Sequence, residues 1–209
     1  MKGQQKVWDA IADKWAEYRE EPIHVVQEFV SAKKGNMLDL GCGSGRNICP
    51  INGKIYGVDF SKNQVANAIR KAQSLNIDFE GIVADATALP FDNNFFDSAI
   101  CISTIHCIEG EINRKKVINE LFRVMKPGGE LMISTWDKFR EISKGKREEM
   151  IGFLVNEVSY KRYYFYFTEE EFLNLLANAG FEIMKVVRDG YTGKNRIFRH
   201  NIEVYARKP

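Results

Sequence analysis

Residues 37–45 read Met37-Leu38-Asp39-Leu40-Gly41-Cys42-Gly43-Ser44-Gly45, an apolar strand that runs into a turn with glycine at every second position. Glycines at such a turn let the backbone bend sharply and let a ligand approach without a Cβ in the way. The dinucleotide fingerprint Gly-x-Gly-x-x-Gly requires glycine at position 46, where this chain has Arg46. The stretch therefore predicts a ligand-binding turn of another kind.

Acidic residues follow the next two predicted strands. Asp59 ends the apolar segment 54–59 and lies 20 residues after Asp39, the offset at which a carboxylate reaches the ribose hydroxyls of an adenosine cofactor. The alternative is that Asp59 is a cap or turn residue. Asp85 follows the predicted third strand, residues 77–83. Acidic residues at successive strand ends indicate one site at one edge of a sheet.

Strand and helix patterns alternate along the chain, which predicts a mostly parallel sheet with helices on both faces. The glycine turn is expected to open a short helix, because Pro50 and Gly53 follow closely. A polar, Lys-rich segment to about Lys161 is predicted to be a linker. The remaining predicted helices are 4–18, 23–32, 62–74 after the cap Ser61, one that ends near 125, and one from the capping box Thr168/Glu171 to Gly180. The remaining predicted strands are 95–102, one that ends at Trp136, and an antiparallel pair, 181–187 and 201–206.

Composition and charge fit one domain over 1–209, with 44% hydrophobic and 28% charged residues. Residues 138–209 carry 14 basic and 10 acidic groups, whereas residues 1–137 carry 16 and 18. A basic C-terminal face suits a polyanionic substrate such as RNA, and the alternative is an ordinary solvated surface.

The four cysteines form no Cys-x-x-Cys pair, so we expect reduced thiols, a cytoplasmic location and no metal site. No apolar run approaches the ~20 residues that span a bilayer, so no membrane association is predicted.

The glycine turn and the acidic strand ends together resemble class I S-adenosylmethionine-dependent methyltransferases. The resemblance implies a Rossmann-like fold with a seven-stranded, mostly parallel sheet and an antiparallel last strand. It divides the chain into N-terminal helices (1–35), a cofactor-binding core (36–137) and a basic C-terminal part with substrate-side elements (138–209). It implies that Asp39 attracts the cofactor's amino group, Asp59 the ribose diol, and Asp85 with Ala86 the adenine edge. The full implied cofactor set is Asp39, Gly41, Gly43, Gly45, Asp59, Phe60, Asp85, Ala86 and Ser103.

The chain also resembles the tRNA wobble-uridine methyltransferases that esterify a carboxymethyl group. The segments that carry this resemblance are 101–108, 123–129, 134–136, 162–165, 179–181 and Tyr18-Arg19. It implies tRNA as the substrate and the acceptor-side residues Arg19, His106, Arg162 and Tyr163. A carboxylate acceptor, with a pKa near about 4, is ionised at neutral pH and needs no strong base. Cationic groups would hold it, and Tyr163 or Tyr164 would stack on a flipped-out base.

The chain departs from the resembled family near His106, and other roles are possible for the acceptor-side residues. The resembled family often has two consecutive histidines where this chain has His106-Cys107. His106 is alternatively a cap of its turn, Arg162 a partner of a glutamate, and the tyrosines core residues. A small-molecule methyltransferase acting on a quinone, sterol or amine is the alternative function. A catalytically silent, methyltransferase-like binding subunit is a further one.

The resemblance finally implies a protein partner. Strand 77–83 is expected at the edge of the sheet and carries little Lys or Pro protection against pairing. Members of the resembled family work with a small zinc-binding activator protein that adds a strand there. The alternative is a self-sufficient monomer whose edge is shielded by neighbouring loops.

Overall fold

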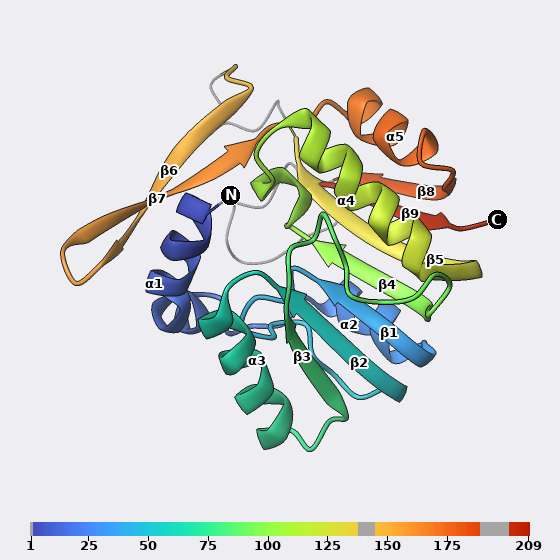
Figure 1. The fold of residues 1–209 in the computed structure, drawn as a ribbon, viewed down its shortest axis with the longest axis horizontal. Helices are drawn as coiled ribbons and strands as arrows, with labels where there is room; N and C mark the ends of the chain where they lie inside the picture. The colour runs from blue at the N-terminus through green and yellow to red at the C-terminus, as the bar shows by residue number, and fades with distance from the viewer. Residues whose placement is uncertain (1, 138–144, 189–200) are drawn as a thin grey trace.

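The computed structural model describes residues 2–137, 145–188 and 201–209. Within these residues the main sheet has seven strands: β1 (Lys34–Leu40), β2 (Asn52–Asp59), β3 (Phe79–Val83), β4 (Phe96–Ile102), β5 (Met125–Trp136), β8 (Glu182–Arg188) and β9 (Asn201–Arg207). Their order is β3-β2-β1-β4-β5-β9-β8 (Figure 1). Strands β1 to β5 pair in parallel, and β9 pairs antiparallel with both β5 and β8. This confirms the predicted mostly parallel sheet with an antiparallel last strand.

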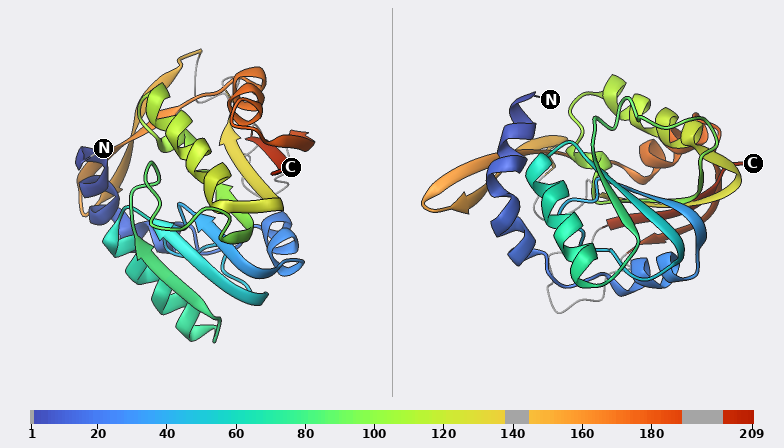
Figure 2. Two further views of the ribbon diagram at one scale, coloured as in Figure 1. Left: turned by 45° about the vertical axis from the view of Figure 1, so that its right-hand side comes forward. Right: turned by 60° about the horizontal axis from the view of Figure 1, so that its bottom comes forward.

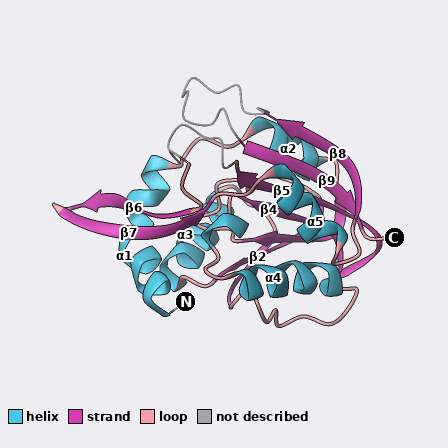
Figure 3. Cartoon of the chain, turned by 90° about the horizontal axis from the view of Figure 1, so that it is seen from above, coloured by secondary structure: helices cyan, strands magenta, loops and turns pink. Residues whose placement is uncertain are grey.

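Helices cover both faces of the sheet, as Figure 3 shows from above. They are α1 (Lys2–Tyr18), α2 (His24–Ser31), α3 (Lys62–Ser74), α4 (Glu111–Val124) and α5 (Glu169–Ala177), with a short 3₁₀ turn, η1 (Ile105–Cys107). Helices α4 and α5 share one apolar core with the sheet, and α2 packs in a second core on the opposite face. Side chains alternate across a strand, so Leu38 enters the first core and Met37 the second. None of the helices described here is long and apolar enough to span a membrane.

Local signals placed several element ends correctly. Helix α3 starts after Ser61, whose side chain accepts a hydrogen bond from the Gln64 backbone N–H, and α5 starts with the predicted Thr168/Glu171 capping box. The prediction of a short helix after the glycine turn is wrong. Residues 41–47 form a succession of turns instead, because Pro50 lies too close for a helix to extend.

The predicted linker is also wrong, because much of it forms a β-hairpin. Strands β6 (Glu148–Val155) and β7 (Val158–Phe165) pair antiparallel through a two-residue turn at Asn156-Glu157, where φ is +47° and +67°. The hairpin runs along α1 (Figure 2). Gln4 of α1 ties the two elements together, since its side chain donates to the Lys161 carbonyl (3.3 Å) and accepts from the Tyr163 N–H (3.0 Å).

Candidate cofactor and acceptor site

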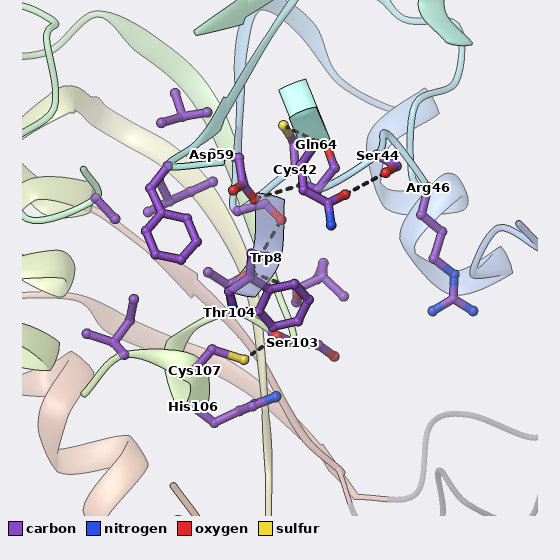
Figure 4. Close-up of a pocket in the computed structure, with 18 of the residues that line it drawn as sticks. Trp8, Cys42, Ser44, Arg46, Asp59, Gln64, Ser103, Thr104, His106 and Cys107 are labelled. Carbon is purple, nitrogen blue, oxygen red and sulfur yellow. Dashed lines mark hydrogen bonds between the residues drawn. The ribbon is translucent and has the colours of Figure 1, made fainter. Parts of the chain in front are cut away.

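A cavity opens at the carboxyl ends of β1, β2 and β4, where parallel α/β sheets bind their ligands. Figure 4 shows part of its lining. Most of the site residues predicted from the sequence line this cavity: Arg19, Gly41, Gly43, Asp59, Phe60, Asp85, Ala86, Ser103 and His106. Asp39, Gly45, Arg162 and Tyr163 lie outside its lining.

The glycine turn forms one wall of the cavity. It is tied to β2, because the N–H groups of Gly41 and Cys42 donate to the Val58 carbonyl (2.7 and 3.1 Å). Gly43 has a φ of +51°, and a Cβ there would have Gln64 Oε1 as its nearest neighbour, at 3.7 Å. A side chain at position 43 would therefore extend into the cavity, so glycine leaves this space for a ligand.

Asp59, at the end of β2, is the carboxylate that reaches the cavity. Its Oδ2 accepts from the Gly43 N–H (3.1 Å) and its Oδ1 from the Ser61 N–H (2.9 Å). Burial raises the pKa of Asp59 to about 6, although the backbone hydrogen bonds favour its charged form. The side chain is thus fixed by backbone donors on both sides and presents its charge beside the turn (Figure 4).

Asp39 and Gly45 lie behind this wall. The Asp39 side chain is in β1 and only 3% exposed, and burial, followed by the nearby Asp59 charge, raises its pKa to about 7. A buried carboxylate of this kind is stabilised when a cation binds nearby. At Gly45 a Cβ would come within 2.6 Å of Ile48 Cδ1 and 3.1 Å of Ala68 Cα, so this glycine lets the turn pack closely against α3.

The loops after β3 and β4 form the opposite wall. Asp85 Oδ1 accepts from both the N–H and the hydroxyl of Thr87 (2.9 and 2.8 Å), which orients this carboxylate. Ser103 adopts a φ of +56° and donates its N–H to Ser134 Oγ (3.1 Å). Ala86 also lines the cavity.

His106 lies deeper in the site, in η1, and is 1% exposed. Its Nδ1 accepts from the Trp136 N–H (3.2 Å), which leaves Nε2 as the protonated nitrogen of a neutral ring. The ring stacks on Trp136 at 4.7 Å between centroids, and Trp136 stacks on Tyr164 at 4.4 Å. Each of these three rings contributes to the cavity wall.

Two arginines lie close to the cavity, one in its lining and one just outside it. Arg19 follows the end of α1 and lines the cavity. Burial is the main cause that lowers its pKa, and the neighbouring Arg162 charge adds to it. Arg162 is 6% exposed and lies behind the wall, 4.6 Å from the Trp15 ring centroid and 5.3 Å from that of Tyr164. Its buried Nε has no hydrogen-bond partner among the described residues.

The structure corrects the assignment of Tyr163 to the acceptor side. Neighbouring residues of a strand point to opposite faces, so Arg162 and Tyr164 share one face of β7 and Tyr163 lies on the other. There its hydroxyl donates to Glu148 (2.6 Å) and lies 3.5 Å from Arg114 Nη1. Of the two tyrosines considered, Tyr164 is the one that lines the cavity.

Sequence reasoning missed several lining residues. Trp8 and Trp15 of α1 both line the cavity, as do Gln64 and Cys107. A signal was present, because an apolar stripe with two tryptophans ends next to the cation Arg19. Burial raises the pKa of the Cys107 thiol to about 12, so this lining group is uncharged.

Several basic residues of the C-terminal part have partners where it is described. Arg188 pairs with Glu169 and Arg207 with Glu182. The Lys208 ammonium donates to the carbonyls of Phe122 and Met125. Lys194, Arg196 and Arg199 lie outside the described residues.

The residues present fit S-adenosylmethionine. A glycine leaves room at the turn, Asp59 offers acceptors for ribose hydroxyls, and buried carboxylates favour a ligand that carries an ammonium and a sulfonium. The fold and the cavity thus define an S-adenosylmethionine-dependent methyltransferase.

Comparisons with known proteins agree. The family described as "Methyltransferase domain" matches residues 38–133. The tRNA (carboxymethyluridine(34)-5-O)-methyltransferase of Arabidopsis thaliana is 37% identical over 63% of this chain and 32% of its own length. The 2-phytyl-1,4-beta-naphthoquinone methyltransferase of the same organism is 30% identical over 86% of this chain and 71% of its own. This chain belongs to the S-adenosylmethionine-dependent methyltransferases. It spans about a third or less of the length of the first curated relatives.

Two solved structures have the same fold. A Burkholderia thailandensis 1,6-didemethyltoxoflavin-N1-methyltransferase, solved with S-adenosylhomocysteine, matches with a TM-score of 0.73 and 18% identity over 98% of this chain and 86% of its own. A Haloferax volcanii complex between the Trm112 methyltransferase activator and a methyltransferase matches with a TM-score of 0.72 and 18% identity over 97% of both chains.

Cofactor affinity is expected to depend on pH. Because burial raises the pKa of Asp39 to about 7 and of Asp59 to about 6, both carboxylates take up protons in the cofactor-free protein as pH falls through this range. A cationic ligand binds the ionised forms better, so affinity should fall about tenfold between pH of about 7.5 and about 5.5. Calorimetry at both pH values checks this. Asp39→Asn should bind more weakly and show a flatter pH profile; a profile parallel to that of wild type would contradict the role of Asp39.

Proposed function

We propose that this chain methylates the carboxymethyl group of a modified wobble uridine in tRNA. The observation that carries the proposal is the acceptor end of the cavity, where Arg19 lines the wall and the buried Arg162 lies directly behind it. Cationic groups of this kind hold a carboxylate. A relative that is 37% identical over 63% of this chain carries this activity in its name.

S-adenosylmethionine supplies a methyl group on a positively charged sulfur. The acceptor carboxylate is already ionised at neutral pH, so the protein needs to orient it rather than to remove a proton. Arg19 and His106 Nε2 are the proposed donors to this carboxylate. The rings of Trp8, Trp15 and Tyr164 exclude water from the acceptor end, and Tyr164 is the proposed surface on which the uridine base stacks.

The direct test is incubation with labelled cofactor and total tRNA, followed by nucleoside analysis. We expect the label in the methyl ester of carboxymethyluridine. The same cofactor supplied with a naphthoquinone tests the alternative, which the quinone methyltransferase relative and the aromatic walls favour. Label in the quinone and none in tRNA would overturn the proposal.

We also propose that an activator protein adds a strand to β3. This strand forms one edge of the main sheet, and Val83 is 51% exposed. The Ile55 N–H donates to the Asp78 carbonyl, and the Ala84 N–H donates to the Asp59 carbonyl. In a parallel pair of strands, every second residue directs its N–H towards the partner strand. Since Ala84 does so, the N–H groups of Gly81 and Val83 point away from β2. A similar fold was solved in complex with an activator.

Val83→Pro removes one outward N–H without removing a bond to β2, and proline is tolerated on edge strands. We expect this variant to lose co-purification with a co-expressed activator of that kind while it keeps its cofactor affinity. Val83→Thr retains the N–H and is the matched control, expected to behave like wild type. A chain that purifies alone as a fully active monomer, with no gain from the activator, would refute the partner proposal.

A further inference from the structure

Trp15 lies close to both arginines of the acceptor end. Its ring centroid is 5.0 Å from the Arg19 guanidinium carbon and 4.6 Å from that of Arg162. Arg162 is only 6% exposed, and Arg19 is half-buried. One indole ring thus serves two cations that come from distant parts of the chain, the end of α1 and strand β7.

Two such cations repel each other when they are buried together. The Arg162 charge contributes to the lowered pKa of Arg19, in addition to burial. The faces of an aromatic ring carry negative charge density and attract guanidinium groups, most strongly where water is excluded. Trp15 therefore offsets a repulsion that would otherwise favour turning one arginine out towards solvent.

Other rings fix the orientation of Trp15. Trp8 and Phe153 each meet it edge to face, at 5.3 Å between centroids and at 84° and 77°. Phe153 comes from β6, and its ring centroid also lies 5.1 Å from the Arg162 guanidinium carbon. The arrangement is thus built from α1 and both strands of the hairpin, and the Gln4 side chain joins α1 to the backbone of β7.

We propose that Trp15 is the positioning residue that makes the acceptor pocket prefer an anionic acceptor over a neutral one of the same shape. It acts through Arg19, which it holds in the cavity wall, and through Arg162, which it retains behind that wall. This inference rests on the proposed function and deepens it, because it assigns the selection for charge to a residue outside the expected acceptor set.

The test compares two nucleosides, 5-carboxymethyluridine and 5-carbamoylmethyluridine, as competing ligands and as substrates. For wild type we expect methylation of the acid and strong preference for it in binding. Trp15→Leu should reduce the preference about tenfold, whereas Trp15→Phe, which keeps a ring face, should retain most of it. Calorimetric affinity for the cofactor should stay within about twofold, because the cofactor contacts the glycine turn and Asp59. Phe29→Leu is the matched control, since Phe29 also faces a cation, Lys33 at 4.2 Å, but lies outside the cavity lining.

Equal loss of binding to both nucleosides in Trp15→Leu, with their ratio unchanged, would overturn the inference. If Trp15→Leu does not fold, Arg162→Met tests the same arrangement and should also lower the ratio. A wild-type chain that methylates neither tRNA nor the acid nucleoside would refute the proposed function instead. In that case, saturation-transfer NMR measures the binding of acetate and acetamide to the cofactor-loaded protein. A preference for acetate that Trp15→Leu abolishes supports the role of Trp15, and the absence of a preference overturns it.

Discussion

An Asp59→Ala variant is expected to bind S-adenosylmethionine roughly 1–3 kcal/mol more weakly than the wild-type chain. The Asp59 carboxylate accepts from the N–H groups of Gly43 and Ser61 and faces the cavity. Its removal would leave those donors without their acceptor, and with them the ribose hydroxyls that we propose Asp59 binds, in a largely buried site. Calorimetric titration of the variant with cofactor measures the loss.

A matched control separates this effect from a general loss of negative charge. Asp78 lies in the loop before β3 and is exposed, so Asp78→Ala should leave cofactor affinity unchanged. Asp59→Asn keeps one acceptor oxygen and should fall between wild type and Asp59→Ala. Circular dichroism establishes that each variant is folded. Unchanged affinity in a folded Asp59→Ala chain would exclude the ribose contact.

The sheet and the cofactor side of the cavity could be predicted because their signals are local. A strand that ends on glycines, a carboxylate 20 residues further on and a capping serine before α3 each reflect backbone geometry within a few residues. The same reasoning failed after Gly45, where an early proline prevents the expected helix. It also failed at 148–165, where a charged composition concealed the alternation of exposed and half-buried residues in β6 and a two-residue turn.

The acceptor side could not be predicted to the same degree, because it depends on contacts between distant segments. Whether position 163 or 164 faces the cavity depends on the register of β7, and a shift of one residue exchanges the faces. That register is set against β6 and by Gln4, 159 residues away from Tyr163. The pairing of Trp15 with Arg162 likewise follows from the packing of α1 on the hairpin, which no short motif encodes.

Substitution of Arg19 is expected to affect the acceptor and not the cofactor. We expect Arg19→Met to lower tRNA methylation about 10- to 100-fold, the effect of losing one or two charge-assisted hydrogen bonds. Arg19→Lys should recover part of the activity, because it restores the charge but not the planar pair of donors. Initial rates with saturating cofactor, together with calorimetric cofactor affinity, measure both effects.

The control for Arg19 is Arg70→Met. Arg70 lies on α3, its side chain is 67% exposed, and it faces Asp13 of α1 at 4.0 Å. Both variants remove one positive charge from the same side of the molecule, so both reduce any general attraction for tRNA phosphates, and that reduction should disappear at high salt. Of the two arginines, Arg19 lines the cavity and Arg70 does not, so the effect of Arg19→Met alone should persist at high salt and with the isolated nucleoside. Equal losses of activity in the two variants would mean that Arg19 contributes only to the general attraction of tRNA phosphates. His106 would then have to hold the acceptor carboxylate without Arg19.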